Sequence, residues 1–180
     1  MSRHIFCDCG VWNGISTKLF FAGKLGVDPQ GYTAYGFDPL KKYLPEIKEL
    51  EEKYPFTFIN KAVWTYDGEV EYGEYPATES SSVKKEKEHF GRAKVYKVPC
   101  IDFSEWIKQF KDDYVFVKMN IEGAEADILE KMIADGTIGI IDYMLWEDHY
   151  KKLDENHTRR IDEIKKQLPF EFHSYRRVPL

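Results

Sequence analysis

Apolar segments of strand length alternate along the chain with segments in which apolar residues recur at helical spacing. Each short apolar run predicts a β-strand, and this alternation is typical of an α/β fold with a mostly parallel sheet. The predicted strands cover residues 5–9, 33–37, 56–64, 69–75, 95–100, 114–121, 140–147 and 170–175. The predicted helices cover residues 14–24, 45–54, 103–110, 123–134 and 154–168. Segment 114–121 is apolar on both faces, which predicts a central, buried strand.

The length and the charge narrow the class of protein. The chain has 180 residues and no internal repeat or linker, so residues 1–180 are expected to form one domain. The formal net charge of −5 disfavours a broad surface for nucleic acid. Three cysteines form no disulfide framework, and Cys7 and Cys9, on one face of a strand, are expected to be buried apolar residues. No membrane-spanning segment or signal peptide is evident, and we expect a cytoplasmic protein.

The loop CDCGVWNG, residues 7–14, joins the first predicted strand to the first predicted helix. Asp8 ends the strand, Gly10 permits a sharp turn, and Gly14 permits the helix to approach a ligand closely. Asn13 is the expected N-cap of that helix. A dinucleotide loop would read G-x-G-x-x-G, whereas this one reads D-x-G-x-x-x-G. An acid at the strand end suits a cationic group, such as the α-amino group of S-adenosylmethionine, better than a pyrophosphate.

Asp38 is a second acid at the end of a predicted strand. It follows Gly14 by 24 residues, near the offset at which an acid binds ribose hydroxyls in nucleotide-binding α/β folds. A carboxylate with two acceptor oxygens matches a vicinal diol, although an Asp before Pro39 also suits a helix cap. One acid for an amine and one for a diol together favour S-adenosylmethionine as the ligand.

The segment KMNIEGAE, residues 118–125, carries charged groups out of the predicted central strand. Lys118 and Glu122 are expected at the edge of the sheet where α/β folds place ligands. Glu125 is explained by the helix dipole, which also accounts in part for Glu122. The segment WEDHY, residues 146–150, likewise ends a strand in acids and a histidine, where a surface cluster is the alternative.

These segments together resemble a known family over nearly the whole chain. CDCGVWNGIST resembles the first motif of class I methyltransferases, and YGFDP is similar to their acidic second motif. VPCIDFSEW, VKMNIEGAEADIL and LWEDH resemble, in order, the later motifs of FkbM-type methyltransferases. The resemblance implies a Rossmann-like three-layer sandwich with a sheet of about seven strands. It also implies S-adenosylmethionine as the donor and transfer to an oxygen, often a hydroxyl of a sugar or polyketide.

The resemblance also implies roles for individual residues. Those expected at the donor are Asp8, Gly10, Asn13 and Gly14 at its methionine end, Asp38 at its ribose and Val63 near its adenine. Those expected at the reacting centre are Lys118, Asn120 and Glu122, with Glu147 and His149 opposite. The family usually has Asp where this chain has Asn120, and an amide is no base, so Glu122, Glu147 or His149 would have to compensate. These last three could form a hard-ligand site for a metal ion but lack diagnostic spacing, so metal dependence stays open and no metal is assigned.

The acceptor and two other functions stay open. A small molecule or glycan is the expected acceptor, and either the polar loop at residues 76–94 or a second subunit, in a homodimer, would close the site. A domain that binds the donor without catalysis is one alternative. A nucleic-acid ribose methyltransferase is the other, with phosphate contacts from Lys84, Lys85, Lys87, Arg92 and Lys94. Glu86 and Glu88 lie among these cations and weaken that interpretation.

Overall fold

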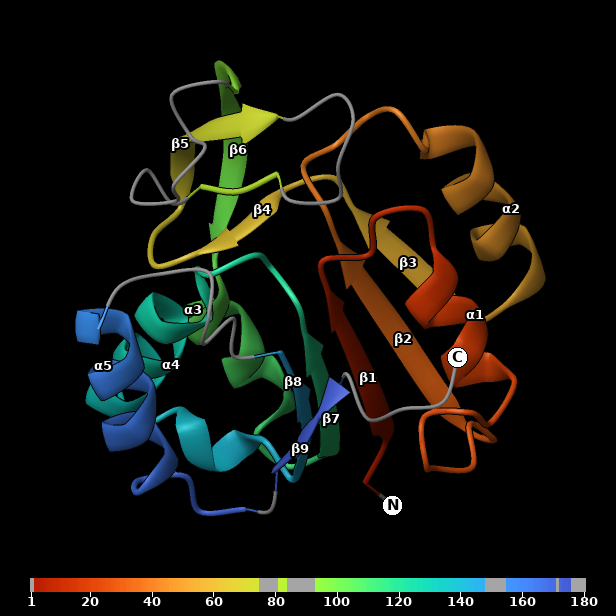
Figure 1. The fold of residues 1–180 in the computed structure, drawn as a ribbon. Helices are drawn as coiled ribbons and strands as arrows, with labels where there is room; N and C mark the ends of the chain where they lie inside the picture. Colours follow the sequence, from red (N-terminus) through yellow and green to blue (C-terminus); the bar gives the residue numbers. More distant parts are fainter. Residues whose placement is uncertain (1, 75–80, 84–92, 148–154, 171, 176–180) are drawn as a thin grey trace.

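The main sheet consists of six parallel strands. A computed structural model describes residues 2–74, 81–83, 93–147, 155–170 and 172–175. The strands lie in the order β3-β2-β1-β7-β8-β9, and all neighbours pair in parallel (Figure 1). Their bounds are β1 His4–Cys9, β2 Tyr32–Phe37, β3 Phe56–Ile59, β7 Tyr114–Met119, β8 Tyr143–Trp146 and β9 Phe172–Ser174. The predicted α/β class with a mostly parallel sheet is confirmed, with six strands in the main sheet.

Helices cover both faces of this sheet and complete the three layers. One face packs against α1 (Ile15–Phe21) and α2 (Leu44–Lys53), and the other against α3 (Phe103–Trp106), α4 (Glu125–Ala134) and α5 (Glu155–Lys165) (Figure 1). Alternate β1 residues serve the two cores, so Phe6 packs with α1 and α2 while Cys7 and Cys9 pack with the other helices. The prediction that these cysteines are buried is confirmed. None of the described helices is long and apolar enough to cross a membrane.

The strand order reverses between β1 and β7, which lie side by side in the middle of the sheet. From β1 the chain builds outward to β2 and β3, and it then crosses over to build β7, β8 and β9 in the opposite direction. The connections after β1 and β7 therefore diverge and leave a crevice at the carboxyl ends of these two strands. Ligands of open α/β sheets bind at such a point.

A second, three-stranded sheet stands over the carboxyl ends of β1 and β2 (Figure 1). It contains β4 (Ala62–Trp64), β6 (Lys94–Asp102) and β5 (Gly68–Glu74) in that order. The β5 and β6 strands are antiparallel and β5 lies at the edge of this sheet, whereas β4 and β6 are parallel. The inward residues of this sheet pack with Ala124 at the start of α4. The second sheet therefore forms a wall beside the crevice.

The prediction of a single strand over residues 56–64 was wrong. The segment is divided between the two sheets, because β3 ends at Ile59 and β4 begins at Ala62. Between them the Lys61 N–H donates to the Ile59 carbonyl at 2.7 Å, and the Asn60 side-chain amide donates to the Asp38 carbonyl at 2.8 Å. A tight turn with a polar anchor thus redirects a chain whose apolar residues continue on both sides.

Two further boundaries differ from the predictions for physical reasons. The helix predicted at residues 123–134 begins at Glu125, because Glu122 and Gly123 have positive φ. The strand predicted at residues 140–147 begins at Tyr143. Just before it, Asp142 pairs with Val115 through its own N–H and its carboxylate, at 2.9 and 2.7 Å. The carboxylate of Asp142 takes the place of a backbone carbonyl as the acceptor of this hydrogen bond, so regular strand pairing begins only at Tyr143.

Candidate functional site

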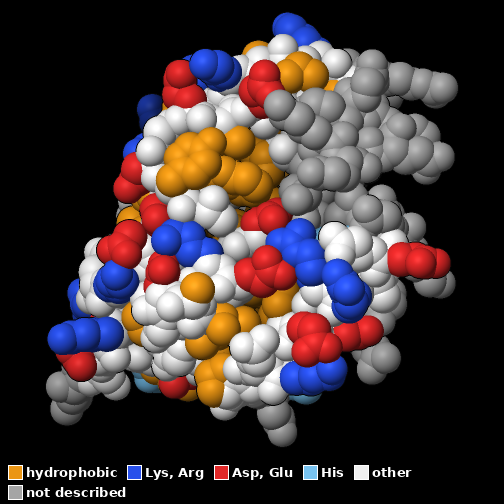
Figure 2. Space-filling model, turned by 90° about the vertical axis from the view of Figure 1, so that its left-hand side faces the viewer, with side chains coloured by type: hydrophobic (Ala, Val, Ile, Leu, Met, Phe, Trp, Pro, Cys, Tyr) orange, Lys and Arg blue, Asp and Glu red, His pale blue; other side chains and the backbone are white. Residues whose placement is uncertain are grey.

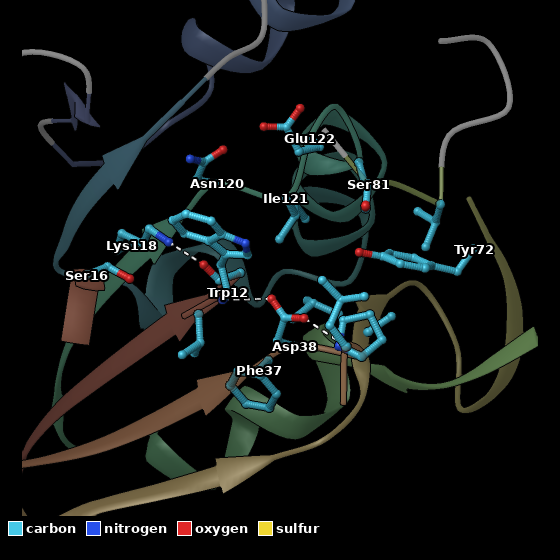
Figure 3. A pocket seen from close by; sticks show the side chains of 18 of the residues that line it. Trp12, Ser16, Phe37, Asp38, Tyr72, Ser81, Lys118, Asn120, Ile121 and Glu122 are labelled. Atoms are coloured by element: carbon cyan, nitrogen blue, oxygen red, sulfur yellow. Dashed lines mark hydrogen bonds between the residues drawn. The ribbon is translucent and has the colours of Figure 1, made fainter. Parts of the chain in front are cut away.

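A cleft of about 330 Å³ lies at the crevice between β1 and β7 (Figure 3). Residues 10–12 after β1, 37–40 at the end of β2 and 120–122 after β7 line it. Ala62, Val63 and Tyr72 of the second sheet close one side. The volume falls within the range of about 300–1,000 Å³ that is typical of small-molecule sites. The described lining combines an apolar wall with a few polar groups at the strand ends.

Gly10 permits the loop after β1 to lie directly against the end of β7. Its φ is 86°, and a Cβ placed on it would lie 2.0 Å from the Asn120 carbonyl oxygen. The Gly10 N–H donates to the Phe37 carbonyl at 2.9 Å, and the Asn120 N–H donates to the Cys9 carbonyl at 3.1 Å. The loop after β1 is therefore joined to both neighbouring strands, and a side chain at Gly10 would separate them.

Asp38 presents a buried carboxylate to the cleft. Its Oδ2 accepts the Trp12 N–H and its Oδ1 the Leu40 N–H, each at 2.9 Å (Figure 3). Burial raises the pKa of Asp38 to about 6, although these two backbone donors act to lower it. Each carboxylate oxygen can accept a second hydrogen bond. The group is therefore ionised at neutral pH and can accept hydroxyl donors from a ligand.

Asp8 and Lys118 form a buried ion pair across the two central strands. Lys118 Nζ lies 2.9 Å from Asp8 Oδ1 and donates to the Gly10 carbonyl at 2.7 Å and to the Cys9 carbonyl at 3.4 Å. The hydroxyls of Ser16 and Thr17 donate to Asp8 Oδ2 at 2.6 and 2.7 Å. Burial acts to lower the pKa of Lys118, the Asp8 carboxylate acts to raise it, and the net change is a rise.

This pairing shows which of the two residues faces the cleft. Lys118 lines the cleft, whereas Asp8 is fully buried and lies outside its described lining. The ammonium of Lys118 uses its donors within the protein, because a carboxylate and two carbonyls surround it. The pair therefore links β1, α1 and β7 beneath the cleft.

Two residues with strained backbones border the cleft. Trp12 and Glu122 are the non-glycine residues with positive φ in the described chain, at 52° and 62°. Both line the cleft, with Glu122 at the opposite edge from Asp38 (Figure 3). Such conformations cost about 1–3 kcal/mol each and are concentrated at functional sites. The strain therefore supports the cleft as the functional site.

Asn120 brings a buried acceptor that has no protein partner among the described residues. Its Oδ1 is buried and makes no hydrogen bond, and the residue lines the cleft beside Gly10. Most buried polar atoms are hydrogen-bonded, and an unsatisfied one costs about 1–3 kcal/mol. A ligand with a donor group would satisfy this atom.

Comparison with known families identifies the kind of protein. The model of the methyltransferase FkbM domain matches residues 8–176. The chain belongs to the FkbM methyltransferase family. FkbM methyltransferases use S-adenosylmethionine as the methyl donor. No curated protein and no solved structure matches the chain.

The cleft of this FkbM methyltransferase has groups that fit S-adenosylmethionine. The donor carries an ammonium group at one end and a ribose diol in the middle, which are both hydrogen-bond donors. Asn120 Oδ1 is a buried acceptor without a partner, and the Asp38 carboxylate is an anionic acceptor in the same cleft. The apolar residues Ala62, Val63 and Tyr72 face them from the second sheet. The two acceptor groups therefore match the ammonium and diol of S-adenosylmethionine, and the apolar wall matches its adenine ring.

Gly14 and Asn13 lie outside the described lining of the cleft. A Cβ on Gly14 would lie 2.6 Å from Leu50 Cδ1 and 3.3 Å from Ile47 Cδ1, so this glycine permits α1 to pack against α2. The N-cap of α1 is Gly14, so the N-cap prediction for Asn13 was wrong. Asn13 Oδ1 instead accepts a hydrogen bond from the Ile15 N–H at 3.2 Å. This bond gives a partner to one of the backbone amides that are left unpaired at the start of a helix.

The other predicted residues are distributed unevenly. Val63 is buried and lines the cleft. Glu147 is buried after β8 but does not belong to the described lining. His149 lies outside the described residues, as do Lys84, Lys85, Lys87 and Arg92. In the part of the chain that the structure describes, no three His, Cys, Asp or Glu side chains are grouped so as to hold a metal ion.

The structure adds three aromatic residues that the sequence did not single out for the site. Tyr72 of β5 and Tyr175 line the cleft, and Lys118 Nζ lies 5.2 Å from the centre of the Tyr175 ring. Trp12 lies within the loop after β1 and also lines the cleft. Spacing along the chain contains no signal for Tyr72 and Tyr175, because a hairpin and a distant segment bring them to the cleft.

Proposed function

We propose that this methyltransferase acts on a hydroxyl of a neutral small molecule, such as a sugar or glycan. The observation that carries the proposal is the state of Lys118, the only cation among the described residues that line the cleft. Its ammonium already forms an ion pair with Asp8 and donates a hydrogen bond to the Gly10 carbonyl. An acceptor with phosphate groups would meet the carboxylates of Asp38 and Glu122, and the described lining contains no further Lys or Arg for it, whereas a neutral hydroxyl compound meets hydrogen-bond acceptors.

The charge of the surface supports the same acceptor class. The chain carries a formal net charge of −5. On the face seen in Figure 2, acidic and basic side chains of the described residues are interspersed, without a continuous basic area. Nucleic acid binds through Lys and Arg that neutralise many phosphates. This pattern therefore favours a small neutral acceptor over a nucleic-acid strand.

For S-adenosylmethionine, we propose that the Asp38 carboxylate accepts hydrogen bonds from the ribose hydroxyls. We propose that Asn120 Oδ1 accepts a hydrogen bond from the ammonium group. The backbone after Gly10 would border the methionine end, and Val63 would border the adenine. The sequence had suggested Asp8 for the ammonium group. Asp8 is fully buried beside Lys118, Ser16 and Thr17, so we propose that it shapes the loop from below.

Two ligands separate the roles of Asp38 and Asn120. S-Adenosylhomocysteine has both the diol and the ammonium group, whereas 5′-methylthioadenosine has the diol alone. We expect Asp38→Asn to lower the affinity for both ligands by about 10–100-fold, because a hydrogen bond to a charged group is lost. We expect Asn120→Ala to lower the affinity for S-adenosylhomocysteine by about tenfold and to change the affinity for methylthioadenosine by less than about twofold. Isothermal titration calorimetry measures the affinity of each ligand for the wild type and for both variants.

The pH dependence provides a control for the Asp38 assignment. The pKa of Asp38 is raised to about 6, so its carboxylate is protonated progressively as the pH falls through 6. The affinity of the wild type for methylthioadenosine should therefore decrease as the pH is lowered through 6. In Asp38→Asn this pH dependence should be absent. Unchanged affinity of Asp38→Asn would contradict the ribose role, and an equal loss of both ligands in Asn120→Ala would contradict the ammonium role.

For the transfer itself, we propose that Glu122 is the general base. When bound, S-adenosylmethionine supplies a methyl group that becomes bonded to the acceptor oxygen, while the electrons of the broken S–C bond stay on sulfur. The acceptor hydroxyl is a weak nucleophile, so its proton has to be taken up as the new bond forms. Glu122 lines the cleft at the edge opposite Asp38, and its carboxylate can take up that proton. His149 stays a second predicted base.

We expect Glu122→Gln to lower the turnover number by about 10²–10⁴-fold, which is the contribution of a positioned base. The affinity for S-adenosylhomocysteine should change by less than about twofold, because the proposed donor contacts remain. A panel of sugars, glycans and other hydroxyl compounds would identify the acceptor by the mass gain of one methyl group, and initial rates would follow. Full turnover in Glu122→Gln would contradict the assignment, and His149→Ala would then be the next variant to measure.

Two outcomes would favour the other functions considered from the sequence. Donor binding without methyl transfer to any compound of a broad panel would favour a binding domain. Steeply salt-dependent binding of RNA would favour a nucleic-acid substrate.

A further inference from the structure

The turn between β7 and α4 holds an unfavourable backbone conformation. Glu122 and Gly123 follow each other with φ values of 62° and 104°. Glycine adopts positive φ freely, but for another residue the left-handed region costs about 1–2 kcal/mol. Left alone, Glu122 would relax to negative φ, and its side chain would point in another direction. Something in the fold therefore holds the turn.

Glu125 supplies that restraint from the first turn of α4. Its side chain is fully buried, and its two carboxylate oxygens accept one backbone amide each. Oε1 accepts the Ile121 N–H and Oε2 the Gly123 N–H, both at 2.8 Å. These two amides flank Glu122 on either side. Ser82 adds a second restraint from outside the helix, because its hydroxyl donates to the Glu122 carbonyl at 2.9 Å.

We propose that Glu125 is a positioning residue that holds the Glu122 side chain at the edge of the cleft. The inference rests on the proposed role of Glu122 as general base. Glu125 itself lies outside the described lining of the cleft, so it acts through the turn and not on the acceptor. Residue 121, which lines the cleft, is held by the same carboxylate.

The helix dipole does not explain this arrangement. A carboxylate in the first turn of a helix is stabilised by the dipole wherever it points. Asp127 in the same turn shows that case, because it is half-buried and pairs with Arg160 at 2.7 Å. Glu125 instead bonds to amides that precede the helix. Asp127 is therefore a matched control that has the helix position but not the contact with the turn.

The first test compares Glu125→Gln with Asp127→Asn. Glutamine has one acceptor oxygen, so its NH₂ group faces an amide N–H and one restraint is lost. With the acceptor found by the mass screen, we expect Glu125→Gln to lower kcat by about 10–100-fold through misplacement of Glu122. The KM for the donor and the affinity for S-adenosylhomocysteine should change by less than about twofold. Asp127→Asn should leave all three within about twofold.

A double-mutant cycle separates positioning from general stability. If Glu125 acts through Glu122, then Glu125→Gln should have no further effect on kcat in the Glu122→Gln background. The same fold-loss in both backgrounds would overturn the inference while leaving the base assignment intact. Full turnover of Glu122→Gln alone would instead contradict the proposed function, so the two failures are distinguishable.

Two further measurements extend the test to the backbone amides and to a second variant, and the first of them needs no acceptor. Hydrogen exchange at the amides of residues 121 and 123 should be faster in Glu125→Gln than in the wild type and Asp127→Asn. Ser82→Ala removes the second restraint and should lower kcat several-fold, again with no further effect in the Glu122→Gln background. Unchanged exchange in Glu125→Gln, or an additive effect of Ser82→Ala, would overturn the proposed positioning.

Discussion

Replacing Lys118 with methionine is expected to lower the free energy of unfolding by about 3–5 kcal/mol, because it leaves the Asp8 carboxylate buried without its counter-ion. Lys118 is 2% exposed and Asp8 0% exposed, and their charged atoms lie 2.9 Å apart. Methionine keeps the length and apolar character of the lysine stem, so packing changes little. Urea unfolding, with the slope of the transition compared between variants, measures the loss.

Two controls separate the charge from the side chain. Lys108→Met removes an exposed cation that pairs with Glu105 within one helical turn, and it should leave the unfolding midpoint unchanged. Adding Asp8→Asn to Lys118→Met removes the second buried charge and should restore part of the stability. If Lys118→Met unfolds at the same urea concentration as Lys108→Met, the ion pair does not stabilise the fold as argued.

The central strands of the main sheet could be located from local patterns because they are buried on both faces. A continuous apolar run such as residues 114–121 is readable without knowing its neighbours, and β7 was predicted within two residues of its end. The division of residues 56–64 between two sheets could not be predicted from the local sequence. It depends on Asn60, whose side chain binds the carbonyl of Asp38, 22 residues earlier in the chain.

The candidate site shows the same division between local and distant information. The ends of β1, β2 and β7 were predicted to meet, because parallel strands place their carboxyl ends at one edge. The direction of each side chain at that edge was not predictable. Asp8 lies near the end of β1 and Asp38 directly follows β2, yet Asp8 points below the sheet edge to Ser16 and Thr17 and Asp38 lines the cleft. Charge and spacing alone do not distinguish these two surroundings.

The role of Glu125 depends on a further step that the sequence conceals. From the sequence alone, an acid in the first turn of a helix is explained by the helix dipole. The structure shows instead that its oxygens bind Ile121 and Gly123 on either side of a strained residue. The strain at Glu122 is invisible in the sequence, since only a glycine would have indicated positive φ there.

Replacing Gly10 with alanine is the second change for which we expect a large effect. The new Cβ would lie 2.0 Å from the Asn120 carbonyl oxygen and 3.3 Å from Ile121 Cγ2. The nearest atom belongs to the backbone, so the end of β7 would have to shift, and with it Asn120 and the Gly10 carbonyl that Lys118 binds. We expect the free energy of unfolding to fall by about 2–4 kcal/mol and the affinity for S-adenosylhomocysteine to fall at least about tenfold.

Gly31→Ala is the matched control for this variant. Gly31 has a φ of 81°, close to the 86° of Gly10, but a Cβ placed on it meets no atom within 4 Å. The control therefore includes the backbone cost of about 1–2 kcal/mol without the collision. The difference between the two variants in urea unfolding isolates the contact with β7, and calorimetry should show undiminished ligand affinity in Gly31→Ala. Equal losses in both variants would mean that the backbone conformation alone, and not the close approach of the two loops, requires glycine at position 10.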